Sequence, residues 1–192
     1  MLAFAMTFSS SCSSEREEHT SKGGPLSAET KAGVTSVDAP EKMPWTATFG
    51  SFLLCSTTGT KITLEEVRYE TLVEPFNISV VMREAPPGSS PVSSASGPPS
   101  SLDGGEGLAG EIEEFKKGWI IDQRCDVNAG GFTELLFVVE SGKFGGHIRQ
   151  AWLDYEAGGN PYTLKIDWQM ITCGTKVEPV DGLDRCEIKA VP

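Results

Sequence analysis

The sequence predicts an all-β fold, an immunoglobulin-like sandwich of two sheets with about seven strands. From Trp45 onward, short apolar runs alternate with Gly, Pro and Asn, which is the pattern of strands separated by turns. No stretch of eleven or more residues keeps the 3.6-residue spacing of an amphipathic helix. The chain of 192 residues is long enough for one domain with a hydrophobic core, and we expect that domain at residues 45–192.

Seven segments of this domain have strand character. The second carries its large side chains at even positions up to Leu64 and at odd positions from Val67 onward, which predicts a bulge near residues 65–66. The segment 134–140, ELLFVVE, is apolar at successive positions and is typical of a central strand covered on both faces. The expected strands span residues 47–55, 61–69, 76–83, 118–125, 134–140, 147–155 and 162–172.

The last two expected strands form a hairpin around the turn EAGGNP, residues 156–161. One face of this hairpin carries nearly all of its large apolar side chains, so that face is expected to point into the core. The register that achieves this pairs Tyr155 with Tyr162, Leu153 with Leu164, Ala151 with Ile166 and Arg149 with Trp168.

The opposite face of the hairpin carries the candidate binding surface. Trp152 is expected to lie beside Lys165 there, among polar neighbours. An apolar indole in a polar field is typical of a recognition surface. The alternative is that Trp152 packs beneath the long insertion or against the Lys165 stem.

Two segments lack the large apolar residues that a packed core requires. Residues 13–44 are rich in Ser, Glu, Lys, Thr and Gly, so they are expected to form a flexible tether. In residues 85–110, 18 of the 26 positions are Pro, Gly or Ser, which predicts a disordered insertion in a loop. A mobile lid over a site is the alternative for this insertion.

Cys12 follows a short apolar opening and stands in the run SSSCS. This run resembles the end of a bacterial lipoprotein signal, in which small residues precede the cysteine that carries the lipid. Ser9 replaces the usual aliphatic residue, and no basic residue precedes Arg16, so the true start is expected upstream. We therefore expect a partial signal at residues 1–12 and a lipid anchor in the cell membrane. The alternative is an ordinary disordered amino terminus with a stray cysteine.

The other four cysteines form an even set, compatible with two disulfides in an oxidising compartment. Four cysteines permit three connectivities, and sequence alone does not choose between them. If the first strand lies parallel to the last, Cys55 joins Cys173 and Cys125 joins Cys186, and this is the expected pairing. A zinc site is not expected, because no two cysteines have the spacing of a zinc knuckle.

Three segments carry a resemblance to a protein family, LLCSTTGTKITLEEVRYE, GGFTELLFVVESGKFGG and YTLKIDWQMITCG. Through them, most of residues 48–174 resembles exported actinobacterial lipoproteins of unknown function. The resemblance implies a small β domain that is lipid-anchored or secreted. It implies no catalytic residue.

The net charge and the missing motifs argue against several classes of function. A net charge of −11 argues against nucleic acid or an anionic lipid surface as the partner. The motifs of serine hydrolases, zinc proteases and phosphate-binding loops are missing, and no cofactor or metal is expected. His147 is expected to be solvated or to cap a strand, and a calcium loop starting at Asp126 fails because Phe137 stands where an acid is needed.

Two functions remain. The first is a lipid-anchored binding or interaction module of the cell envelope, with an envelope protein or polymer as its partner. The alternative is a small envelope hydrolase that uses a pair of carboxylates facing each other across a cleft. Its candidate acids are clustered in the sequence at Glu65, Glu66, Glu70 and Glu74, and at Glu111, Glu113 and Glu114.

Overall fold

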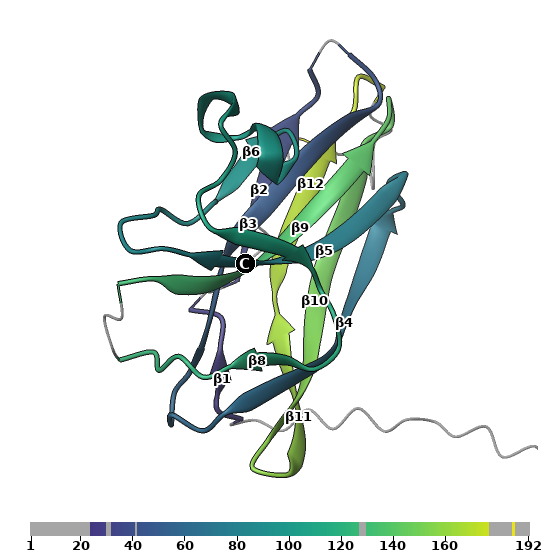
Figure 1. Cartoon of the computed structure of the whole chain (residues 1–192). Coiled ribbons are helices and arrows are strands. Elements are labelled where there is room, and N and C mark those ends of the chain that lie inside the picture. Colours follow the sequence, from purple (N-terminus) through teal and green to yellow (C-terminus); the bar gives the residue numbers. More distant parts are fainter. Residues whose placement is uncertain (1–23, 30–31, 41, 127–129, 177–185, 187–192) are drawn as a thin grey trace, which may run out of the picture.

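The computed structural model describes residues 24–29, 32–40, 42–126, 130–176 and 186. Two six-stranded sheets pack face to face (Figure 1), so the predicted two-sheet β-sandwich is confirmed. We name the sheets after their central strands. The β9 sheet has the order β1-β3-β9-β5-β7, with β6 also pairing β3, and the β10 sheet has the order β2-β12-β10-β4-β8, with β11 also pairing β10.

The β9 sheet is built from β1 (Leu26–Ser27), β3 (Trp45–Ser56), β5 (Asn77–Ala85), β6 (Ser94–Ser96), β7 (Glu111–Glu114) and β9 (Phe132–Ser141). The β10 sheet is built from β2 (Gly33–Asp38), β4 (Ile62–Val73), β8 (Trp119–Ile121), β10 (Gly146–Ala157), β11 (Asn160–Ile166) and β12 (Trp168–Cys173). Two short 3-10 helices, η1 (Pro99–Ser101) and η2 (Asp103–Gly105), follow β6. The described part of the chain contains no helix long and apolar enough to traverse a lipid bilayer.

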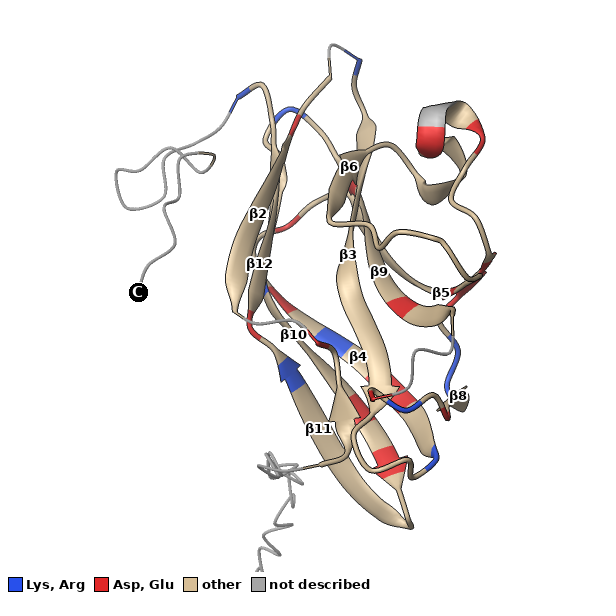
Figure 2. Cartoon of the chain, turned by 90° about the vertical axis from the view of Figure 1, so that its left-hand side faces the viewer, with Lys and Arg blue, Asp and Glu red and all other residues tan. Residues whose placement is uncertain are grey.

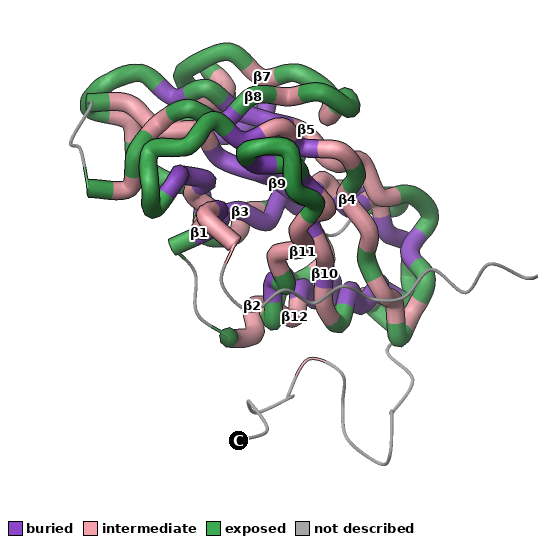
Figure 3. Tube along the Cα trace, turned by 90° about the horizontal axis from the view of Figure 1, so that it is seen from below, coloured by how far each residue is buried: buried purple, intermediate pink, exposed green. Residues whose placement is uncertain are grey.

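The core lies between the two sheets, where the buried parts of the trace gather (Figure 3). Phe52 of β3 is at its centre, with ring centroids 5.8 Å from Phe137 and 6.4 Å from Trp168, both edge to face. Leu64 and Leu153 close the core from the β10 sheet, fully buried. Alternation along each strand places these apolar side chains on the inner faces.

The predicted bulge in the second strand is confirmed. Leu64 pairs with Tyr155 whereas Glu66 pairs with Asp154, so Glu65 is the extra residue. This single insertion moves Val67 onto the inner face that Leu64 occupied before it.

Three of the four predicted hairpin pairs are confirmed, namely Tyr155 with Tyr162, Leu153 with Leu164 and Ala151 with Ile166. The pairing of Arg149 with Trp168 is wrong, and the expected strand 162–172 divides at Asp167. Beyond Asp167, β12 pairs Met170 with Ile148, one residue out of the hairpin register, and Arg149 is exposed while Trp168 packs on the core.

The tether prediction for residues 13–44 is wrong for its described carboxy-terminal half. β1 pairs with β3, and β2 lies parallel to β12 as an outer strand of the β10 sheet. Of the apolar side chains of this segment, Leu26, Ala28 and Val37 are buried, whereas Val34 and Ala39 are partly buried and Ala32 and Met43 are exposed. Backbone pairing supplies the remaining contacts, which is why composition did not reveal these strands. Cys12 and the rest of the expected signal lie outside the described residues.

The predicted cysteine pairing is also wrong. The disulfides join Cys55 to Cys125 and Cys173 to Cys186, with Cα–Cα distances of 5.0 and 5.7 Å. The parallel partner of the last strand is β2 rather than β3, so Cys55 and Cys173 lie in different sheets. A hydrogen bond of 3.1 Å from the Cys125 N–H to the Ser56 carbonyl places Cys125 beside Cys55 instead.

The insertion at 85–110 is ordered, contrary to its predicted disorder. β6 pairs with β3, and Val92 and Leu102 are buried against Leu136 on the outer face of the β9 sheet. The prediction that β9 is a central strand covered on both faces is therefore confirmed, and the insertion supplies the second cover.

Candidate functional site

The sandwich is open along the side where β4 and β5 run, one in each sheet. β8 pairs with β4 only through Ile62–Leu64, and β7 pairs with β5 only from Val81 to Glu84. No described strand continues alongside β4 beyond Leu64 or alongside β5 before Val81. The link between β7 and β8 crosses from one sheet to the other at the lower end of this opening (Figure 1).

Two backbone hydrogen bonds fix that crossing. The Phe115 N–H donates to the Val80 carbonyl at 2.9 Å, and the Gly118 N–H donates to the Leu64 carbonyl at 2.8 Å. Segment 74–76 joins β4 to β5 at the other end of the opening. The two connections therefore frame a hollow between the sheets, which we call the edge groove.

The edge groove has a volume of about 520 Å³. Its floor is apolar and comes from β4, β5 and the crossing, through Val67, Tyr69, Ile78, Val80 and Phe115. Tyr69 is the most open of these, with 39% of its surface exposed. The bulge at Glu65 is what aims Val67 and Tyr69 into the groove, because without it these side chains would point to the other face of β4.

The rim of the edge groove is acidic. Glu65, Glu66 and Glu114 line it together with one basic residue, Lys117. The Lys117 Nζ lies 2.5 Å from Glu65 Oε2, so the protein itself offsets part of this negative charge. Figure 2 shows acidic positions on the ribbon of β4. The groove therefore favours a ligand that carries positive charge and some apolar surface.

The predicted surface at Trp152 and Lys165 lies on the outer face of the β10 sheet. The two residues are register partners, as expected. Trp152 is half-buried, with the Arg68 guanidinium 5.5 Å from its ring centroid, while Lys165 Nζ lies 3.4 Å from an Asp167 oxygen. The insertion packs on the other sheet, so Trp152 does not lie beneath it.

Asp154 ties this outer face together. It accepts two hydrogen bonds from Arg68, at 2.8 and 3.0 Å, and one from the Thr163 hydroxyl at 2.6 Å. Trp152 is thus surrounded by side chains that already bond to one another. Its role in recognition remains a prediction.

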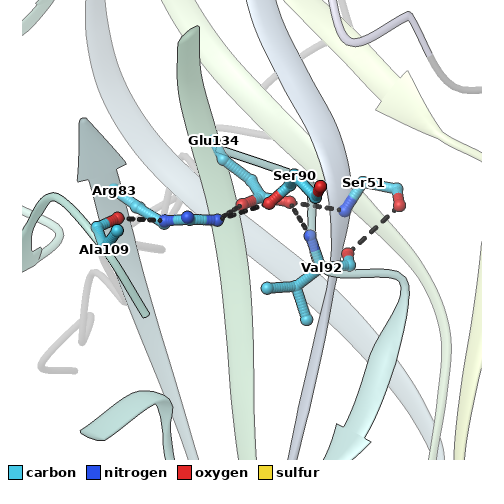
Figure 4. A network of polar contacts seen from close by, with 6 residues as sticks. All are labelled: Ser51, Arg83, Ser90, Val92, Ala109 and Glu134. Atoms are coloured by element: carbon cyan, nitrogen blue, oxygen red, sulfur yellow. Dashed lines mark hydrogen bonds and ion pairs between the residues drawn. The ribbon is translucent and has the colours of Figure 1, made fainter. Parts of the chain in front are cut away.

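A second hollow, of about 680 Å³, lies within the ordered insertion. Beneath it, Arg83 and Glu134 form a buried ion pair with 2.9 Å between Nη1 and Oε2 (Figure 4). Glu134 Oε1 accepts from the N–H groups of Ser51 and Val92, both at 2.9 Å. Arg83 donates to the carbonyls of Ala109 and Ser90, at 2.9 and 3.1 Å. Through these hydrogen bonds the pair holds the insertion in place, so we regard Arg83 and Glu134 as structural residues.

The remaining sequence candidates lie away from the edge groove. His147 is buried, with its Nε2 2.9 Å from Gln169 Oε1. The Asp126 carboxylate binds Arg124 at 2.7 and 2.8 Å, and this hydrogen bonding lowers the pKa of Asp126. Residues 127–129 of the calcium-like loop lie outside the described residues.

Two groups of described side chains are close enough to share a metal ion. They are Glu29 with Cys55 and Cys125, and Asp38 with Cys173 and Cys186. In both groups the sulfur atoms belong to a disulfide, and a disulfide sulfur is not a thiolate ligand. The oxidised protein therefore offers only one carboxylate at each place.

Of the acidic residues that the sequence singled out, the structure brings Glu65, Glu66 and Glu114 into the edge groove. Glu70 instead binds Arg149 and Gln150, and Glu74 accepts from the Thr71 hydroxyl at 2.6 Å. The apolar floor was not foreseen, because it requires knowing that β7 stops at Glu114.

No protein family model and no curated protein matches this chain.

Proposed function

We propose that this protein is an exported binding module that a lipid on Cys12 holds at the cell membrane. The edge groove is the observation that carries the binding role. It combines an apolar floor, an acidic rim and the open edge of a strand in one concave place, which is the combination expected of a recognition site.

Two features support the extracytoplasmic location. Both pairs among the four cysteines of the domain are disulfides, and such bonds persist in oxidising compartments. The sequence around Cys12 resembles a lipoprotein signal.

Mass spectrometry of the mature amino terminus tests the anchor. We expect a diacylglyceryl group on Cys12 as the first residue, and loss of membrane association in the Cys12→Ser variant. An unmodified Met1 on the mature protein would contradict the anchor.

Capture from the envelope tests the binding role. The Cys12→Ser protein is immobilised and exposed separately to detergent-solubilised envelope proteins and to isolated wall polymer from the source cells. We expect one component to be retained by this protein and its retention to fall at least tenfold with Tyr69→Arg, which places a bulky charge on the groove floor.

Phe144→Arg is the matched control for Tyr69→Arg. Phe144 is an aromatic residue of similar exposure, 45%, but it does not line the groove. Retention that survives Tyr69→Arg and is lost with Trp152→Ala would assign binding to the outer face of the β10 sheet. Retention of no component by any form would contradict a binding module.

The hydrolase is the second candidate, and the carboxylates of the rim are the observation that favours it. Glu66 and Glu114 both line the hollow, and paired carboxylates can serve as acid and base for glycoside hydrolysis. Release of nitrophenol from chromogenic glycosides by the native protein, abolished by Glu114→Gln, would support the enzyme. Equal release by both proteins would attribute the activity to a contaminant.

A further inference from the structure

The edge of β5 is vacant over its first three residues, Asn77–Ser79. The described strand β7 runs alongside β5 from Glu84 to Val81 and ends at Glu114. Phe115 still bonds to Val80, and after Phe115 the chain turns toward the β10 sheet, so no described strand lies beside Asn77–Ser79. This stretch is therefore available to another strand of about three residues, roughly 10 Å at 3.3 Å per residue.

The backbone of this edge points the right way for pairing. The Val80 carbonyl accepts from Phe115, so the backbone groups of Val80 face away from β9. Alternation along a strand then places the N–H and C=O of Ile78 on the same side. No described strand pairs with Ile78 on that side.

The side chains beside this edge favour an added strand in which apolar and basic residues alternate. Ile78 and Val80 point into the edge groove and share its floor with Val67, Tyr69 and Phe115. Every second side chain of an added strand would contact this apolar floor. The intervening side chains would lie toward the acidic rim, where Glu114 favours Lys or Arg.

We infer that the edge groove binds an extended, basic segment of a partner protein, which adds as a strand to β5 at Asn77–Ser79, beyond the point where β7 ends. This inference rests on the proposed binding function and specifies its partner. Backbone hydrogen bonds to Ile78 provide affinity, the apolar floor selects alternate apolar residues, and the rim selects positive charge.

Charge argues against a second copy of this chain as the occupant. Edge-to-edge pairing of two β5 strands would bring two acidic rims together, and each chain has a net charge of −11. Like charges placed opposite one another across a strand pair are destabilising. A basic segment would instead be attracted to the acidic rim.

A displayed library of random heptapeptides provides the test. The library is selected on the immobilised Cys12→Ser protein. We expect enrichment of peptides that alternate apolar residues with Lys or Arg. A synthetic copy of an enriched peptide should slow hydrogen exchange of the Ile78 amide at least tenfold, while exchange in β11 stays unchanged.

Ile78→Pro removes the outward N–H without touching the ladder with β9, and proline is tolerated on edge strands. We expect this variant to bind the synthetic peptide at least tenfold more weakly, whereas Ile78→Val, which keeps the N–H, binds within about twofold. The exchange measurement on the Cys12→Ser protein keeps the inference falsifiable if Ile78→Pro does not fold.

Failure to enrich any peptide, enrichment without basic residues, or protection of amides other than those of β5 would overturn the inference. Concentration-dependent protection of Ile78 without peptide would assign the edge to a second copy and would overturn it as well. If the library fails while envelope capture still depends on Tyr69, the proposed binding function stands and only strand addition is wrong.

Discussion

At the residue scale, the buried pair of Arg83 and Glu134 determines how the insertion is held. Both side chains are almost completely buried, with 1% and 0% exposed. A charge buried in this way is tolerated because each partner is neutralised by the other and its remaining groups are hydrogen-bonded. Arg83 ends one expected strand and Glu134 begins another, and nothing in their spacing indicates that they meet.

Removing one partner of this pair is therefore expected to destabilise the domain. Arg83→Ala leaves the Glu134 carboxylate buried without its counter-ion, which should lower the free energy of unfolding by about 3–5 kcal/mol. Urea denaturation followed by fluorescence measures the change. The Arg83→Met/Glu134→Leu double variant is the control, and it should recover part of the loss because no charge remains buried, although the backbone groups that the pair bonded lose these partners. A loss below about 1 kcal/mol in Arg83→Ala would show that water reaches the carboxylate.

Tyr155 predicts a pH dependence of stability. Burial raises the pKa of its phenol, and the hydrogen bond from the Leu26 N–H opposes this shift. A raised pKa in the folded state means that the folded protein holds the proton more tightly, so stability is retained below about pH 10 and falls as the pH rises above it. The fall should be smaller in Tyr155→Phe. Thermal unfolding between pH 8 and about 11 checks this, and identical curves for both proteins would contradict it.

At the element scale, strands were predictable where side chains alternate and unpredictable where pairing is only through the backbone. β3, β5 and β9 lie where the sequence placed them because their large side chains alternate or run continuously. β2, with the sequence GVTSVD, buries only Val37 and depends on its parallel neighbour β12. The three-residue β6, SAS, has no apolar signal at all. Such strands become visible only when the partner strand is known.

The ordered insertion makes a prediction about proteolysis. Although residues 85–110 have the composition of a linker, Val92 and Leu102 are buried and the Gly50 N–H bonds the Ser93 carbonyl at 3.1 Å. We expect limited proteolysis of the native protein to spare this segment. Leu102→Asp places a charge against Leu136 and should open the segment to cleavage before the rest of the domain, as mass spectrometry of the fragments would show. Cleavage at 85–110 in the native protein at the same rate would contradict its packing.

At the scale of the whole molecule, the order of the strands determines the cysteine pairing and the edge groove, and the sequence did not reveal this order. The two-sheet architecture followed from strand number and turn spacing, but the partner of each cysteine depends on which strands are neighbours. The edge groove depends on the same information, since it exists because β7 and β8 cover only part of β5 and β4. The alternation of side chains indicated that Val67 and Tyr69 share one face of their strand. It did not indicate that the neighbouring strands stop short and leave these residues open to a groove.

The two disulfides should differ in their effect on stability. Cys55 and Cys125 are separated by 70 residues and Cys173 and Cys186 by 13. Because a crosslink that closes a longer loop removes more entropy from the unfolded chain, replacing the first pair with serines should cost more, within the usual range of about 2–5 kcal/mol. Chemical denaturation of the two double variants measures this. Equal costs would mean that the unfolded chain is not the main site of the effect, and non-reducing peptide mapping checks the pairing itself.

The parallel pairing of β2 with β12 also has a mechanical consequence for an anchored protein. A lipid on Cys12 would transmit any pull first to β1, which two residue pairs join to β3, and then to β2. Six residue pairs, from Gly33 with Trp168 to Asp38 with Cys173, join β2 to β12. A force along the axis of β2 would load all of these residue pairs at once, in shear. A force perpendicular to the strands would break them one after another. The first strands of the fold would then bear tension between the membrane and whatever the domain holds.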